Sequence, residues 1–363
     1  MDRERIITGS DGDCGEQAGS LTLPRGIRRG VRIRRVVRAG ELSAPHQLLL
    51  CTVLLPALVL ASCTTTLPGR GSVSPGDYVG HLDSREEDLS RRSYLIHVTR
   101  RRDDALPPPV VLVLHGAFGT ARGIEERSGF SRLADEEGFV AVYPNGYGFL
   151  GILRHWDAGH CCGRARSLGL DDVGFLDAVL DDVARRVEID ATRVYVVGES
   201  NGAMLAYQYA AVRSHRIAGA AAVIGTIGSG PAGAEERIPP PEMPVPMVIV
   251  HGSADPRIPF HGGSSERDPE VSWVSVADGA AFWVAHNGAQ PEALTTTLYG
   301  GRVVRSVWHG EGDTAPVVLY EIRDWPHVWP GPDAMATLAP DDQLRGFDTA
   351  RVVWANLRSH RRK

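Results

Sequence analysis

The fold is decided by Val194-Tyr195-Val196-Val197-Gly198-Glu199-Ser200-Asn201-Gly202, an apolar run that leads into a Gly-x-Ser-x-Gly motif. A helix-forming stretch continues from the motif to Val212. Where a strand turns sharply into a helix in this way, the serine hydroxyl stands above the end of the sheet, and the glycines permit the close turn. Amide groups at the start of the helix lie beneath the serine and can stabilise an oxyanion. The stretch therefore predicts a nucleophile, Ser200, in an α/β fold.

Apolar runs alternate with amphipathic segments along the chain from about Tyr78 onward. This alternation is typical of a mostly parallel sheet with helices on both faces. We therefore expect an α/β-hydrolase fold, with Ser93–Val98 as an earlier, antiparallel edge strand. The expected central strands are Val110–Leu114, Val140–Tyr143, Val194–Val197, Ala218–Val223, Met247–Val250 and Val317–Ile322. The expected helices are Ile124–Glu137, Val173–Val187, Gly202–Val212, Gly279–His286 and Thr349–Ser359.

A serine nucleophile needs a base and a carboxylate that orients the base. In an α/β-hydrolase these follow the serine in the order acid and then histidine, each after a later strand. Asp255 comes soon after the expected strand Met247–Val250, and His327 comes soon after Val317–Ile322. Both positions fall at the sheet edge where ligand sites of α/β proteins form. Alone, each could be a loop residue, but together and in this order they predict a catalytic triad with Ser200.

Other residues compete for these roles. Asp324 is a rival acid, but it lies only three residues before His327, on the same loop. The remaining histidines that we considered do not follow a core strand after Asp255, so we interpret them as surface or loop-shaping residues. These histidines are His115, His251, His286, His309 and His360.

The loop after the early strand Val110–Leu114 is expected to supply one oxyanion donor. We predict that the backbone N–H groups of Ala117 and Asn201 are the two donors. Trp156 and Trp329 are candidates for a flat aromatic wall beside the substrate, because one of them follows the candidate histidine by only two residues. The alternative is that both tryptophans are plain core residues.

Two cysteines, Cys161 and Cys162, are adjacent in a segment that also holds His155 and His160. Three interpretations remain open: a vicinal disulfide that stiffens the loop, a metal site, or two buried thiols. We favour the disulfide, which export would permit. The spacing matches no zinc pattern, so we expect no metal, and we expect no organic cofactor either.

The N-terminal part is typical of a targeting segment. An arginine cluster from Arg25 to Arg38 precedes an apolar run, Leu48–Leu60, which is short for a membrane span and suits the core of a signal peptide. Leu60-Ala61-Ser62-Cys63 resembles a bacterial lipobox, and cleavage elsewhere is the alternative. The predicted parts are a lipoprotein signal peptide (1–62), lipidated Cys63, a flexible tether (63–77) and a catalytic domain (78–363). The protein would then be exported, and either lipid-anchored to the cell membrane or secreted.

Composition sets the remaining limits. The 363 residues have room for one large α/β domain or two smaller ones. Hydrophobic residues make up 43% and charged residues 23%, as in an ordinary soluble globular protein. The formal net charge of −5 gives no reason to expect nucleic-acid binding.

Six motifs stand in the order found in one known family, namely Leu114–Gly116, Trp156–Gly163, Asp171–Phe175, Gly198–Gly202, His251–Asp255 and His327–Gly331. Between about Ser93 and Gly331, the chain resembles the esterase family of polyhydroxybutyrate depolymerases, feruloyl esterases and mycobacterial LpqC-like lipoprotein esterases. The resemblance implies an esterase with the same three catalytic residues. Gly202-Ala203 departs from the usual Gly-Gly, and Asn287-Gly288-Ala289 lacks the usual cysteine, which removes a disulfide partner for Cys161 or Cys162.

These observations predict a serine esterase that hydrolyses carboxylic esters through an acyl-enzyme. Candidate substrates are short-chain acyl esters, feruloyl or aryl esters, and hydroxyalkanoate esters, as small molecules or oligomers. A cell-envelope acyltransferase would use the same triad with an alcohol in place of water. A non-catalytic binding lipoprotein is the alternative from another class, and the complete triad argues against it. The expected partners are the ester and, through Cys63, the membrane.

Overall fold

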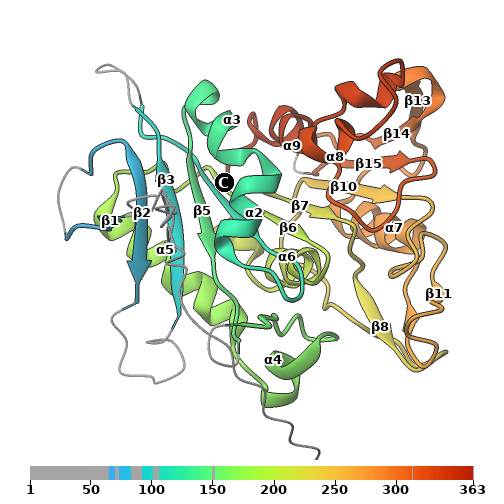
Figure 1. Cartoon of the computed structure of the whole chain (residues 1–363). Helices are drawn as coiled ribbons and strands as arrows, with labels where there is room; N and C mark the ends of the chain where they lie inside the picture. The colour runs from blue at the N-terminus through green and yellow to red at the C-terminus, as the bar shows by residue number, and fades with distance from the viewer. Residues whose placement is uncertain are drawn as a thin grey trace, which may run out of the picture. The chain divides into compact units, whose positions relative to one another are not determined.

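The described residues form a sheet of eleven strands at the centre of the fold, which Figure 1 shows with its helices. The computed structural model describes residues 65–69, 73–82, 92–100, 106–148, 152–312 and 314–362. Across the sheet the strands follow the order β1 (Thr65–Thr66), β2 (Gly76–His81), β3 (Ser93–Val98), β5 (Val140–Pro144), β4 (Val110–Leu114), β6 (Val194–Glu199), β7 (Gly219–Val223), β10 (Met247–Gly252), β15 (Val317–Ile322), β14 (Val303–Trp308) and β13 (Leu294–Leu298).

The centre of this sheet is parallel and buried on both faces. Six adjacent strands pair in parallel with one another, in the order β5, β4, β6, β7, β10 and β15. Every residue of β4 is buried: Leu112 belongs to one core cluster, and Val111 and Val113 belong to the other. Because successive side chains of a strand point to opposite faces, an unbroken apolar run supplies both cores at once.

Helices cover both faces of the sheet (Figure 1). Side chains of α5, α6 and α7 pack in one core, among them Phe175, Leu205 and Trp283. Side chains of α2, α3 and α9 pack in the other, among them Phe130 and Trp354. The expected α/β-hydrolase architecture is therefore confirmed. The helices are α2 (Ala121–Ser128), α3 (Phe130–Glu137), α4 (Gly163–Leu168), α5 (Asp172–Arg186), α6 (Asn201–Val212), α7 (Val276–Asn287), α8 (Pro332–Met335) and α9 (Thr349–Leu357).

One predicted helix, Ile124–Glu137, is two helices in the structure. Gly129 separates α2 from α3 with a φ of 76°, in the left-handed region that glycine adopts without strain. Thr120 caps the start of α2 by accepting a hydrogen bond from the Gly123 amide at 3.0 Å. The apolar pattern continues across the break, so periodicity alone did not locate it.

The prediction that Ser93–Val98 is an edge strand is wrong, although its antiparallel direction is confirmed. Strand β3 pairs antiparallel with β5 on one side, and β2 covers its other side. Part of the predicted tether is also ordered, because Thr65–Thr66 pairs with β2 and the side chain of Leu67 is buried. Strand β2 has few continuous apolar residues and was not recognisable as a strand.

A second, small sheet lies in the segments that follow β7 and β10. Its strands follow the order β11 (Gly263–Ser264), β12 (Ser272–Trp273), β8 (Gly228–Gly230) and β9 (Glu236–Arg237), all antiparallel. Parallel strands end at the same sheet edge, so this small sheet stands beside the carboxyl ends where a site is expected.

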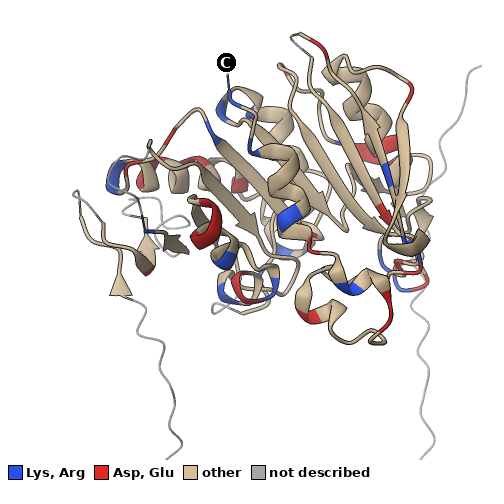
Figure 2. Ribbon diagram, turned by 90° about the horizontal axis from the view of Figure 1, so that it is seen from above, with Lys and Arg blue, Asp and Glu red and all other residues tan. Residues whose placement is uncertain are grey.

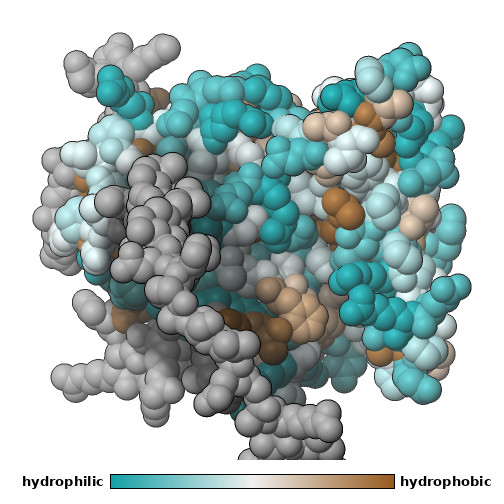
Figure 3. Space-filling view, viewed as in Figure 1, coloured by the Kyte–Doolittle hydropathy of each residue, from teal (hydrophilic) through white to brown (hydrophobic). Residues whose placement is uncertain are grey.

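The predicted signal peptide and the lipidation site Cys63 lie outside the described residues. Within the described part of the chain, no helix is both long enough and apolar enough to cross a membrane. The face seen in Figure 3 is mainly hydrophilic, with small apolar patches.

Candidate active site

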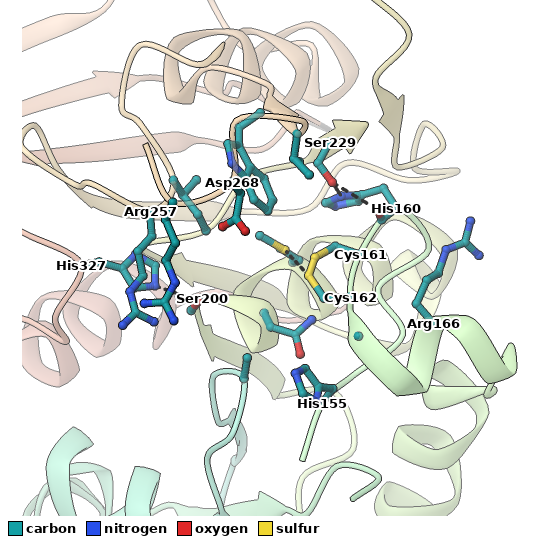
Figure 4. A pocket seen from close by; sticks show the side chains of 18 of the residues that line it. His155, His160, Cys161, Cys162, Arg166, Ser200, Ser229, Arg257, Asp268 and His327 are labelled. Atoms are coloured by element: carbon teal, nitrogen blue, oxygen red, sulfur yellow. Dashed lines mark hydrogen bonds between the residues drawn. A yellow bond between two sulfur atoms is a disulfide. The ribbon is translucent and has the colours of Figure 1, made fainter. Parts of the chain in front are cut away.

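The structure brings Ser200, His327 and Asp255 together (Figure 4). The Nε2 atom of His327 lies 2.9 Å from the Oγ atom of Ser200. The Nδ1 atom of the same ring lies 2.7 Å from the Oδ2 atom of Asp255. Each residue follows a different strand of the parallel sheet, namely β6, β15 and β10. A hydroxyl, an imidazole and a carboxylate in one hydrogen-bonded chain can activate the hydroxyl as a nucleophile.

A strained turn presents Ser200. Its backbone has a φ of 52° and a ψ of −118°, which a residue with a side chain rarely adopts. The Ser200 amide donates to the Val223 carbonyl at 2.9 Å, which ties the turn to β7. A Cβ atom at Gly198 would lie 2.1 Å from the Gly202 carbonyl oxygen, so only glycine fits there. The motif glycines thus allow β6 and α6 to meet at the serine.

Asp255 accepts several hydrogen bonds, from backbone amides as well as from histidine. Its Oδ1 atom accepts from the amides of Arg257 at 2.8 Å and Ile258 at 3.0 Å. Its Oδ2 atom faces His327 and lies 3.4 Å from His251 Nε2. Burial by itself would raise the pKa of the carboxyl, but hydrogen bonds from His251 and His327 outweigh burial and hold the pKa of Asp255 below its ordinary value. The group therefore remains a carboxylate at neutral pH.

Two of the rival residues, Asp324 and His115, take no part in the triad. Asp324 donates its backbone amide to the Ser253 hydroxyl, and its side chain is exposed. His115 is completely buried, with Nδ1 at 2.7 Å from the Gly116 carbonyl oxygen. Burial lowers the pKa of His115 to about 3, so it is a neutral structural residue. Among the described residues that line the pocket at Ser200, the histidines are His155, His160 and His327.

The two predicted oxyanion donors flank Ser200 in the same pocket. Ala117 lines the pocket, and in the described part of the chain its amide has no hydrogen-bond partner. Asn201 is the first residue of α6, where a backbone amide has no partner within the helix. Both amides are therefore available to an oxygen held above Ser200.

Two polar side chains, those of Glu199 and Asn201, hold the loops that carry these amides, and neither role was predicted from the sequence. Glu199 accepts from Arg127 Nη2 at 2.6 Å and from the Gly116 amide at 3.3 Å, which joins α2 and the Gly116 loop to the turn. The Asn201 side chain accepts from the Trp156 amide at 2.8 Å and donates to the Trp156 carbonyl at 3.0 Å.

The prediction that Trp156 and Trp329 form an aromatic wall is wrong. Trp156 is completely buried, and its indole N–H donates to the His115 carbonyl at 2.8 Å. Trp329 is 3% exposed and packs in the core on the α2 and α9 side. Neither is among the described residues that line the pocket. Both large rings fill space beneath the loops, which is the commoner use of tryptophan.

The pocket at Ser200 has a volume of about 540 Å³. Two aromatic residues line this pocket: Trp273, which belongs to the small sheet, and Phe118. The side chain of Phe118 is 57% exposed. The ring of Phe118 packs edge-on against His155 at 4.6 Å between centroids. Sequence reasoning missed both aromatic residues.

A disulfide joins Cys161 to Cys162 in the pocket wall. The Nδ1 atom of His160 lies 3.1 Å from the Ser229 hydroxyl oxygen. Burial lowers the pKa of His160 to about 4. Among the described residues, no group of three or more His, Cys, Asp or Glu side chains is arranged to hold a metal ion.

Several curated proteins that are similar to this chain are named as esterases. The sequence model of the dienelactone hydrolase family matches residues 96–266. "Putative esterase NocK" of Nocardia uniformis subsp. tsuyamanensis is 31% identical over 278 residues, which cover 71% of this chain and 78% of that protein. Feruloyl esterase C of Emericella nidulans is 24% identical over 309 residues, which cover 83% of this chain and 100% of that protein. A solved ferulic acid esterase of Anaeromyces mucronatus aligns with a TM-score of 0.47 at 15% identity, covering 72% and 88% of the two chains.

Proposed function

The chain belongs to the dienelactone hydrolase family of carboxylic ester hydrolases, and on that basis we propose that it cleaves its substrates through an acyl-enzyme formed on Ser200. The observation that carries the proposal is the continuous chain of hydrogen bonds from the Ser200 hydroxyl through His327 to Asp255. The hydroxyl stands at the strained turn before α6. Beside it lie the backbone amides of Ala117 and Asn201, for which the described residues provide no hydrogen-bond partner.

In the first step, His327 Nε2 takes the proton of the Ser200 hydroxyl as the oxygen attacks the ester carbonyl carbon. Asp255 stabilises the imidazolium that forms. The amides of Ala117 and Asn201 bind the carbonyl oxygen as it becomes negative. The C–O bond to the alcohol then breaks, the alcohol leaves with the proton from His327, and an acyl-Ser200 ester remains.

In the second step, water attacks the acyl-Ser200 ester and gives a proton to His327. The second tetrahedral intermediate collapses, the carboxylic acid leaves, and His327 returns the proton to Ser200. An alcohol in place of water would give acyl transfer with the same residues. Analysis of products with and without added alcohol distinguishes the two reactions.

The proposed substrates are esters with a short acyl chain or a single aromatic ring, including feruloyl and hydroxyalkanoate esters. This proposal is supported by the pocket volume of about 540 Å³, and by the two aromatic residues, Trp273 and Phe118, that line it. A panel of such esters, ranked by kcat/KM, is the direct test of chain length and aromatic preference.

The Ser200→Ala variant tests the mechanism. We expect kcat/KM for p-nitrophenyl acetate to fall by at least about 10³-fold, because the nucleophile is lost while the pocket remains. A fluorophosphonate probe should label the wild type at Ser200 and leave the variant unlabelled. Turnover by the purified variant at the wild-type rate would refute the assignment, and an unlabelled wild type would favour a non-catalytic binding protein.

We also propose that the protein is exported and lipidated at Cys63. The proposal is supported by the arginine cluster, the apolar run and the lipobox-like Leu60-Ala61-Ser62-Cys63. In a bacterial host, the wild type should partition into a detergent phase and incorporate labelled fatty acid, and the Cys63→Ala variant should do neither. Equal partitioning of both would refute the anchor.

A further inference from the structure

The pocket at Ser200 carries a reactive group that the proposed mechanism does not use, the disulfide between Cys161 and Cys162. Figure 4 shows both cysteines in the wall of the cavity that Ser200 and His327 also line. A disulfide is reactive because a thiolate can attack either of its sulfur atoms. The bond is therefore open to attack by a thiol that is small enough to enter the pocket.

The two sulfur atoms have different surroundings. Cys161 is 9% exposed and belongs to the core cluster on the α5 and α6 side of the sheet. Cys162 is only partly buried, and its Sγ atom lies 3.9 Å from the Sδ atom of Met204. Met204 also lines the pocket, and its amide donates to the Ser200 carbonyl at 3.0 Å, one turn of α6 from the nucleophile. The space open to a displaced sulfur atom is therefore on the Cys162 side, in the pocket.

The loop that carries the disulfide is also held by hydrogen bonds that do not involve the sulfur atoms. The Asn201 side chain bonds to both polar groups of the Trp156 backbone, which ties the loop to α6. The Ser229 hydroxyl donates to the His160 carbonyl at 3.1 Å, which ties the loop to β8 of the small sheet. We therefore expect the loop to keep its position when the S–S bond is broken, so that the change is confined to the pocket wall.

We expect the size of a thiol, rather than its charge, to decide whether it reaches the bond. Figure 2 shows basic and acidic residues interspersed along the coloured part of the ribbon, so charge of one sign does not dominate the molecule. The pocket has a volume of about 540 Å³. A cavity of this volume admits a thiol of low molecular weight and excludes a folded protein.

We propose that the disulfide of Cys161 and Cys162 is a redox-modification site, which a dithiol of low molecular weight reduces from within the pocket, and that its reduction slows the hydrolysis of bulky esters. The inference rests on the proposed function, because it concerns the pocket in which Ser200 acts. It assigns a chemical role to two cysteines that the triad and the oxyanion donors do not involve.

The reduction is an exchange of disulfide bonds. One thiolate of the dithiol attacks the Sγ atom of Cys162, the less buried of the pair, and a mixed disulfide forms while the S–S bond to Cys161 breaks. Cys161 leaves as a thiolate. The second thiolate of the dithiol then displaces Cys162, and the reagent departs as a cyclic disulfide. The protein has gained two electrons, the two cysteines take up the two protons that the dithiol has lost, and the dithiol is oxidised.

Reduction changes the shape of the pocket wall. A covalent bond holds two sulfur atoms closer together than non-bonded atoms can approach, so the two thiols must move apart. Cys161 lies in the core, where close packing leaves it no space, so the thiol of Cys162 moves into the pocket. A narrower pocket hinders an ester that fills it and leaves room for a small ester.

The test compares oxidised and reduced wild-type protein on a bulky ester, p-nitrophenyl hexanoate, and on a small ester, ethyl acetate. The protein is treated with dithiothreitol, freed of the reagent and assayed under nitrogen, and alkylation followed by mass spectrometry establishes that Cys161 and Cys162 are reduced. We expect kcat/KM to fall at least about fivefold for the hexanoate and by less than about twofold for ethyl acetate. Reoxidation with diamide should restore the first value, and the circular dichroism spectrum should stay the same throughout.

Two variants assign the response to the adjacent pair. The double variant Cys161→Ser with Cys162→Ser keeps the other three cysteines of the chain, and dithiothreitol should not change its kcat/KM for either ester. The matched control carries Cys14→Ser, Cys51→Ser and Cys63→Ser and keeps the adjacent pair. It should respond to dithiothreitol as the wild type does. If the double variant does not fold, the reduction and reoxidation of the wild type, together with the matched control, still decide the question.

The outcomes separate this inference from the proposed function. If the oxidised wild type hydrolyses the esters, and Ser200→Ala does not, the proposed function stands. The redox site alone is then refuted if the disulfide of the folded protein resists dithiothreitol, if both esters are affected equally, or if the double serine variant responds as the wild type does. If Ser200→Ala retains activity on the esters, the proposed function and this inference fall together.

Discussion

At the scale of single residues, the arrangement of the site depends on Asp255. One of its oxygens is held by two backbone amides, and the other faces His327. The pKa of Asp255 lies below its ordinary value, so the carboxylate persists at neutral pH and holds the imidazole with its proton on Nδ1. The Nε2 atom is then free to accept the proton of Ser200.

The Asp255→Asn variant should lower kcat by about 10³- to 10⁴-fold while leaving the fold intact, because an amide can turn its NH₂ group toward Nδ1 and favour the wrong tautomer. The measurement is steady-state hydrolysis of p-nitrophenyl butyrate by protein with an unchanged circular dichroism spectrum. Asp324→Asn is the control, since Asp324 has a φ of 58° and asparagine tolerates that conformation. If the Asp324 variant loses activity and the Asp255 variant does not, Asp324 is the orienting acid.

At the scale of elements, the turn between β6 and α6 depends on a close approach of backbones. A Cβ atom at Gly202 would lie 2.5 Å from the His115 carbonyl oxygen and 2.6 Å from that of Leu114. Neither oxygen can move without shifting β4 and the loop that carries Ala117. The same glycine thus fixes helix packing and the placement of an oxyanion donor.

We therefore expect Gly202→Ala to lower the free energy of unfolding by about 2–3 kcal/mol, because added volume at a closely packed site forces backbone shifts. Gly279→Ala is the matched control within α7. A Cβ atom there would meet Ile227 at an ordinary 3.7 Å, so the change should raise stability by about 0.5–1 kcal/mol through helix propensity. Urea unfolding of both variants is the measurement. Equal effects of the two substitutions would contradict the steric account of the turn.

The elements differ in how far sequence predicts them. The central strands, such as Val110–Leu114, were predictable because burial on both faces demands an unbroken apolar run. The short strands of the small sheet carry no periodic pattern, so Trp273 could not be assigned to the pocket. Trp329 was misassigned for a related reason: its position two residues after His327 does not say which way its ring points.

At the scale of the whole molecule, the pH dependence of the free energy of unfolding depends on ionisable groups whose pKa is shifted by burial. Burial lowers the pKa of His115 to about 3, and burial raises the pKa of Asp172 to about 6 despite its ion pair with Arg92. These two groups have opposite effects on the free energy of unfolding as the pH falls below 6. At His115 only the unfolded chain binds a proton, so acid favours unfolding. At Asp172 only the folded state binds a proton, so acid favours folding.

His115 alone accounts for a measurable loss of stability between pH 7 and pH 5. In the unfolded chain its pKa returns to about 6.5, so the unfolded state gains protons in this range, and the free energy of unfolding falls by about 2 kcal/mol. The His115→Asn variant removes this contribution, and its amide can still donate to the Gly116 carbonyl that His115 Nδ1 contacts at 2.7 Å. The variant is expected to be less stable than the wild type at pH 7, because it loses the packing of the His115 ring against Trp156. The two ring centroids lie 4.8 Å apart.

The test is urea unfolding of both proteins at pH 7 and pH 5. The wild type should lose about 2 kcal/mol more between the two pH values than the variant does. Asp172 contributes equally to both proteins, so its opposite effect cancels in this difference. The lowered pKa of Asp255 changes the free energy of unfolding only below about pH 4, which is outside the range measured. Parallel losses in the two proteins would show that His115 takes up a proton in the folded state and that its burial does not keep it neutral.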